Sequence, residues 1–146
     1  MRLILFPLIT LFLNLPTLAA AEMIKATASF SILGDIVERV GGDLVDVSSI
    51  VGPDSDAHTY SPTVGDARAV AKADIVFING LGFEGWVGDL IAASDNDAPV
   101  IAVTRDIEPL LVEDEADPHA WNDLSNGATY ARAVMEGLSA LDPDNA

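Results

Sequence analysis

Residues 75–79 read IVFIN, a continuous apolar run that ends in one polar residue. A half-exposed strand alternates apolar and polar side chains, whereas a strand of a parallel sheet is covered on both faces and stays apolar throughout. Gly80 and Gly82 follow directly and are expected to turn the chain. This stretch therefore predicts a strand of a parallel sheet that has helices over both of its faces.

Three further strands and four helices are predicted around this run. The strands are expected at 24–30, 45–51 and 100–103, and the helices at 32–40, 62–73, 83–93 and from near Ser125 to Pro143. Ser31 and Ser61 precede the first two helices and are expected to cap them, while residues 104–118 are expected to be mostly loop. Strand and helix alternate four times, which predicts an α/β domain with a four-stranded, mainly parallel sheet and helices on both faces.

The N-terminal residues 1–21 have the pattern of a secretory signal peptide. Arg2 is the single charge, an apolar run follows, and the segment ends in Ala19-Ala20-Ala21, small residues of the kind that signal peptidase requires. The alternative is a membrane anchor, but Pro7 and Pro16 interrupt a run that is barely long enough to span a bilayer. We therefore expect a signal peptide at 1–21 and the folded domain at 22–146.

Charge and cysteine content narrow the classes of partner. The chain has 7 basic and 23 acidic residues, and loss of residues 1–21 leaves six basic residues and a formal charge of −17. Such a surface repels nucleic acid. The chain has no cysteine, so we expect no disulfide, no thiolate metal site and no lipid anchor on cysteine. These features favour a protein released into a periplasm.

The two histidines of the chain occur in similar surroundings. His58 lies in DSDAHTYSP (54–62) and His119 in DPHAW (117–121). Each follows a predicted strand, and loops at the carboxyl ends of parallel strands form the ligand crevice of such folds. Neutral imidazole binds zinc and its neighbours in the first transition row. The residue types thus leave two alternatives open, a shared metal site and a pair of solvated loop histidines.

Neighbouring residues also allow two interpretations each. Asp56 and Asp117 each lie two positions before a histidine, and either could orient the imidazole ring or tie its own loop. Tyr60 and Trp121 could wall a site or pack against the domain. Glu84, in GLGFEGW, is interpreted as structural. No HExxH, G-x-S-x-G or complete dinucleotide fingerprint is present.

Three ordered blocks resemble the metal-binding receptors of zinc and manganese ABC importers. They are SFSILGDIVERVGGD, VGPDSDAHTYSPTVGDARAVAKADIVFINGLGFEGW and DPHAWNDLSNG. The resemblance implies that His58 and His119 are metal ligands in the N-terminal lobe of a two-lobed protein, in which the second lobe supplies the remaining ligands. It also implies a non-enzymatic, monomeric periplasmic protein that captures Zn²⁺ or Mn²⁺ and delivers it to the membrane permease of an ABC transporter.

The sequence departs from the family pattern in two respects. It stops about where the helix that links the lobes is expected, so the second lobe is absent from it, and we expect two imidazoles alone to bind metal weakly. Glu113, Asp114 and Glu115 lie where zinc-specific members often carry a histidine-rich loop, which weakens the case for zinc against manganese. A secreted zinc-dependent hydrolase, an adhesion module and a non-functional fragment are the alternative functions.

Overall fold

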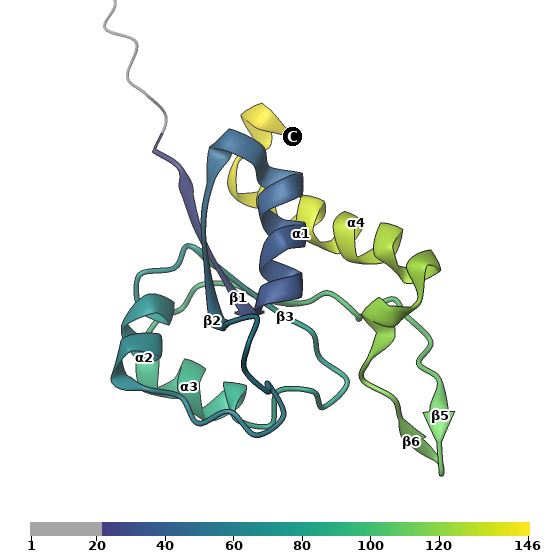
Figure 1. Ribbon diagram of the computed structural model, residues 1–146. Coiled ribbons are helices and arrows are strands. Elements are labelled where there is room, and N and C mark those ends of the chain that lie inside the picture. The colour runs from purple at the N-terminus through teal and green to yellow at the C-terminus, as the bar shows by residue number, and fades with distance from the viewer. Residues whose placement is uncertain (1–21) are drawn as a thin grey trace, which may run out of the picture.

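The main sheet has four parallel strands in the order β2-β1-β3-β4 (Figure 1). The strands are β1 (Ile24–Phe30), β2 (Val45–Val51), β3 (Ile75–Ile78) and β4 (Val100–Ala102). This computed structural model describes residues 22–146, so the predicted signal peptide at 1–21 lies outside the described residues. The predicted α/β class and the parallel sheet are confirmed.

Helices cover both faces of this sheet. The helices α1 (Ser31–Gly41) and α4 (Leu124–Leu141) pack against each other over one face, and α2 (Val64–Val70) and α3 (Val87–Ser94) lie together on the other side (Figure 1). In β3, Ile75 and Phe77 face Gly137 of α4, where an added Cβ would lie 3.0 Å from each side chain. Val76 points to the opposite face and is also buried. Burial on both faces is the physical reason why IVFIN is apolar at successive positions.

The start of α2 differs from the prediction because a capping box forms further along the chain. Thr63 is the N-cap, and its hydroxyl accepts a hydrogen bond from the Asp66 backbone N–H at 3.3 Å. The Asp66 carboxylate accepts the Thr63 backbone N–H in return, at 2.6 Å. The predicted cap at Ser61 is therefore wrong. The cap at Ser31 is also wrong, because α1 begins at that residue and its N-cap, Phe30, makes no side-chain bond.

The predicted helix at 83–93 begins four residues late, at Val87, because the chain turns at 80–82 and is still turning up to residue 86. Gly80, Leu81 and Gly82 have φ values of 86°, 55° and 75°, a left-handed conformation that glycine adopts at little cost. Glu84 folds back over this turn, and its carboxylate accepts the backbone N–H groups of Asn79 and Gly80. The chain can enter α3 only after this turn is complete.

Residues 104–118 are mostly loop, as predicted, but they contain a short hairpin. Its strands are β5 (Leu111–Val112) and β6 (Glu115–Ala116), which pair antiparallel. Glu113 and Asp114 form the turn with φ values of 53° and 68°, as a two-residue type I′ turn requires. Three 3-10 turns, η1 (Gly42–Leu44), η2 (Ala120–Asn122) and η3 (Pro143–Asn145), complete the fold. Within residues 22–146, the helices are too short or too polar to cross a membrane.

Candidate metal centre

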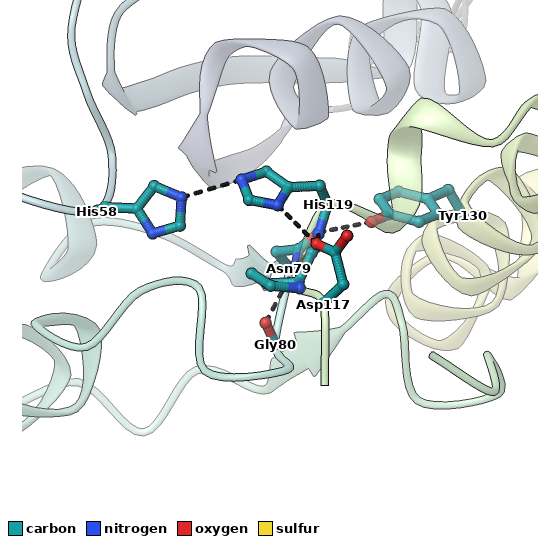
Figure 2. A network of polar contacts seen from close by, with 7 residues as sticks. His58, Asn79, Gly80, Asp117, His119 and Tyr130 are labelled. Atoms are coloured by element: carbon teal, nitrogen blue, oxygen red, sulfur yellow. Dashed lines mark hydrogen bonds and ion pairs between the residues drawn. The ribbon is translucent and has the colours of Figure 1, made fainter. Parts of the chain in front are cut away.

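The two histidines lie side by side at the carboxyl edge of the sheet. His58 belongs to the loop after β2, and His119 directly precedes η2. Although the two positions are 61 residues apart in the chain, their Nε2 atoms lie 3.1 Å from each other (Figure 2). The ring centroids are 5.1 Å apart, and both residues are exposed to solvent. The predicted convergence of the two imidazoles is confirmed.

The His58 loop is held by contacts to its backbone. Asp56 Oδ1 accepts the His58 backbone N–H at 2.9 Å, and its Oδ2 accepts the Thr59 hydroxyl at 3.1 Å. Trp86 donates its indole N–H to the carbonyl of Ala57 at 2.7 Å. Asp56 therefore ties its own loop, which is one of the two roles considered for it, and these contacts orient the backbone that carries the His58 ring.

Asp117 makes the corresponding backbone contact and one contact more. Its Oδ1 accepts the His119 backbone N–H at 3.0 Å and also lies 2.6 Å from Nδ1 of the His119 ring (Figure 2). The hydrogen bond from the His119 backbone N–H lowers the pKa of Asp117 most, and the contact with the His119 ring lowers it further. Burial acts in the opposite direction but has a smaller effect. Because the carboxylate is charged at neutral pH, Nδ1 of His119 carries the proton and Nε2 presents a lone pair to His58.

The short distance between the two Nε2 atoms limits what can lie between them. Two lone pairs that faced each other at 3.1 Å would repel. The contact therefore requires either a proton on Nε2 of His58, donated to His119, or a cation that both nitrogens bind. Two imidazole nitrogens on one tetrahedral zinc ion, each at about 2.0–2.1 Å, lie about 3.3 Å apart. The observed spacing thus fits a shared metal ion with little movement of either ring.

Aromatic side chains form the inner wall of this pair. Phe83 contacts His58 edge to face, with ring centroids 4.7 Å apart, and Trp121 contacts His119 at 5.2 Å. Phe83 and Trp121 also contact each other, at 4.8 Å. Tyr60 does not join this wall, because it packs against Trp86 instead. The sequence analysis identified Trp121 but missed Phe83, and the available signal was an aromatic residue directly after the predicted turn at Gly80 and Gly82.

A buried polar cluster lies behind the site. Glu84 is buried, and its carboxylate accepts hydrogen bonds from the Ser29 hydroxyl at 2.5 Å and from the Asn79 backbone N–H at 2.6 Å. These contacts agree with the structural interpretation of Glu84. Tyr130 of α4 is fully buried and donates its hydroxyl to Asn79 Oδ1 at 2.5 Å (Figure 2). Burial, and to a lesser extent the charge of Glu84, raises the pKa of Tyr130, so that its hydroxyl keeps its proton.

The described residues supply only part of a coordination shell. Within 22–146, no group of three or more histidine, cysteine, aspartate or glutamate side chains is placed to hold one metal ion. The acidic residues Glu113, Asp114 and Glu115 lie at the exposed tip of the β5–β6 hairpin. The site of this domain is therefore an open pair of nitrogen donors on an aromatic wall.

The structure is thus a parallel α/β domain that presents two converging imidazoles at one edge of its sheet. Comparison with known proteins gives its family. Residues 27–146 match the family described as ZnuA, zinc-uptake complex component A, periplasmic, and the chain belongs to this family. The resemblance to metal receptors of ABC importers is thereby confirmed.

Two relatives of this chain are named for manganese. Manganese-binding lipoprotein MntA of Halalkalibacterium halodurans is 40% identical over 126 residues, which cover 86% of this chain and 42% of MntA. The manganese ABC transporter substrate-binding lipoprotein PsaA of Streptococcus mitis is 33% identical over 138 residues, with 87% of this chain and 45% of PsaA covered. Both are binding proteins by name.

A solved structure has the same fold. The Mn-bound periplasmic metal binding protein from Candidatus Liberibacter asiaticus aligns with a TM-score of 0.78 at 36% identity, over 84% of this chain and 47% of that protein. This chain therefore spans less than half the length of each of these three relatives.

Proposed function

We propose that His58 and His119 bind one divalent transition metal ion through their Nε2 atoms. The observation that carries this proposal is the 3.1 Å spacing of the two nitrogens, which fits a shared ion. The contact of Asp117 with Nδ1 of His119 supports it, because a carboxylate on one ring nitrogen makes the other nitrogen a better metal ligand.

The whole protein then acts as an extracytoplasmic solute-binding protein. It captures Zn²⁺ or Mn²⁺ as cargo and delivers the ion to the membrane permease of an ABC transporter, without catalysing a reaction. Residues 1–21 are a cleaved signal peptide that directs it to the periplasm, and residues 22–146 are the N-terminal metal-binding lobe of a monomer. Family membership and the names of the manganese relatives support this assignment.

Two imidazoles on an exposed rim leave part of the coordination shell to other ligands. A tetrahedral ion needs four donors, so we expect water in the remaining positions when residues 22–146 bind metal alone. At equal supply, nitrogen donors favour zinc over manganese by the usual stability order. The choice of metal in the cell then depends on the remaining ligands and on metal supply.

An enzymatic role would need further groups at this rim. A zinc hydrolase requires a general base beside the bound water. Asp117 contacts the His119 ring but is engaged with Nδ1 and the backbone N–H of that residue. Glu84 is buried and accepts hydrogen bonds from Ser29, Asn79 and Gly80. Capture of a metal ion accounts for the observed contacts better than hydrolysis does.

Calorimetric titration of the chain with Zn²⁺ and with Mn²⁺ tests the proposal. We expect one ion per chain with weak affinity, about micromolar or weaker for two imidazole ligands, and loss of binding in both His58→Ala and His119→Ala. Asp114→Asn, at the acidic hairpin tip, serves as the control and should bind as the unmodified chain does. Metal binding that persists in His58→Ala and in His119→Ala would contradict the proposal. Loss of metal binding in Asp114→Asn would contradict it too.

A further inference from the structure

Asn79 joins four segments of the chain at one buried point. It follows β3, is fully buried, and makes hydrogen bonds through every polar group that it has. Its backbone carbonyl accepts the Thr104 hydroxyl at 2.6 Å, and its backbone N–H is bound by Glu84. Its side chain reaches two further segments, the loop that carries His119 and helix α4 (Figure 2).

The orientation of the Asn79 amide follows from its partners. Nδ2 lies 2.9 Å from the carbonyl of Pro118 and 3.1 Å from the carbonyl of Gly80. Oδ1 receives the Tyr130 hydroxyl at 2.5 Å. The opposite orientation would place the amide oxygen against two carbonyl oxygens, which can only accept hydrogen bonds. The amide therefore holds both carbonyls, and the hydroxyl of Tyr130 satisfies its oxygen.

The bond to Pro118 acts on the residue directly before His119. Proline has no backbone N–H, so the carbonyl is the only backbone group through which Pro118 can be anchored by a hydrogen bond. On the other side of Pro118, Asp117 binds Nδ1 of the His119 ring. The backbone on which His119 stands is thus fixed from the protein interior, while the ring itself is oriented from the surface by Asp117.

We propose that Asn79, braced by Tyr130 of α4, is a positioning residue that sets the backbone of His119 so that its Nε2 meets Nε2 of His58. This inference rests on the proposed metal-binding function and extends it to two residues that do not touch the ion. It also makes α4 part of the site, since a shift of Tyr130 would release the amide that holds Pro118.

Tyr130→Phe is the sharpest variant, because it keeps the ring and its packing and removes only the hydroxyl. Thr104→Val is its matched control, since it removes a buried hydroxyl that binds the same asparagine through the backbone carbonyl rather than the side chain. The chain is kept free of metal with EDTA, and the imidazole ¹⁵N and ¹H NMR signals then report the environment and motion of the two histidine rings. We expect the His119 signals to shift or broaden in Tyr130→Phe, while those of His58 change less, and Thr104→Val to leave both unchanged.

The metal titration is then repeated with Zn²⁺ on both variants and on Asn79→Ala. Loss of an outer partner of a ligand typically lowers metal affinity by about 10–100-fold, and we expect about tenfold for Asn79→Ala and a smaller loss for Tyr130→Phe. A chain that binds no Zn²⁺ at all would refute the proposed function. A chain that binds through both histidines, with affinity and His119 signals unchanged in Tyr130→Phe, would refute only the positioning role.

Equal losses of Zn²⁺ affinity in Tyr130→Phe and Thr104→Val would also overturn the inference, because they would reflect general destabilisation of the fold. Each variant is therefore first checked for folding by circular dichroism at the temperature of the titration. If Asn79→Ala is unfolded there, Tyr130→Phe still decides the outcome.

Discussion

Trp86 at the entry of α3 and Ala57 in the loop after β2 are joined by a 2.7 Å hydrogen bond from the indole N–H to the backbone carbonyl. Ala57 is buried and immediately precedes His58. The loop that carries His58 is therefore held by the residue that precedes α3. The loop that carries His119 is held in a similar way by Asn79, through the carbonyl of Pro118.

Trp86→Phe should loosen the His58 loop. Phenylalanine keeps an aromatic contact with Tyr60 but cannot donate to the Ala57 carbonyl. We expect a loss of about 1 kcal/mol in the free energy of unfolding, measured by urea denaturation. Amide hydrogen exchange should quicken at residues 57–59 and stay unchanged at Asp117 and His119. Equal acceleration in both loops would argue against this local role.

Asp117→Asn and Asp56→Asn should differ although the two aspartates occupy the same position relative to a histidine. Asp117 contacts the His119 ring, whereas Asp56 accepts hydrogen bonds from the His58 backbone N–H and the Thr59 hydroxyl. We expect Asp117→Asn to lower Zn²⁺ affinity by about tenfold and Asp56→Asn to lower it much less. Calorimetry on the two variants gives the comparison, and equal effects would show that the ring contact has no special role.

This pair shows what the sequence can and cannot predict. The D-x-H spacing placed both aspartates as candidates, but only the folded loops decide which carboxylate reaches a ring. The apolar run at 75–79 and the alternation of strand and helix predicted the sheet, and from the sheet the convergence of His58 and His119. Such inferences depend on local pattern and on the rule that parallel strands end at one edge.

The role of Asn79 was missed because it depends on a long-range contact. Asn79 and Tyr130 are 51 residues apart and meet only because α4 packs over β3.

The start of α2 was misplaced for a local reason. Ser61 and Thr63 are both plausible caps, and only Thr63 has an aspartate three residues later. Here the capping-box pattern was present in the sequence and should have decided between them.

The capping box also predicts how stability depends on pH. Burial works against the charged form of Asp66, but hydrogen bonds from Thr63 and Tyr60 outweigh it and lower the pKa of Asp66. A lowered folded-state pKa stabilises the fold above the unfolded-state value of about 3.9, and this contribution disappears as the pH falls through the folded-state pKa.

Asp66→Asn should therefore be less stable than the unmodified chain at pH 7, by about 1 kcal/mol as for other lost caps. The difference should shrink at about pH 3, below the unfolded-state pKa of about 3.9, because the unfolded chain then binds a proton more readily than the folded chain does. Urea denaturation at the two pH values measures both differences, with Asp114→Asn as a control from the hairpin tip. A difference that grows in acid would contradict the capping role.

Metal binding should also stabilise the fold. A ligand at about 100 times its dissociation constant adds about 2.7 kcal/mol to the free energy of unfolding, so saturating Zn²⁺ should raise the melting temperature. EDTA should reverse the rise, and His119→Ala should abolish it. A rise of the same size in His119→Ala would place the stabilising ion elsewhere on this acidic surface.

The most direct test of the shared ion is anomalous diffraction at the zinc edge from crystals of the chain grown with Zn²⁺. The paired imidazoles predict one peak between His58 and His119, at about 2.0–2.1 Å from both Nε2 atoms. A zinc ion on only one ring, on Nδ1, or at the acidic hairpin tip would contradict the account.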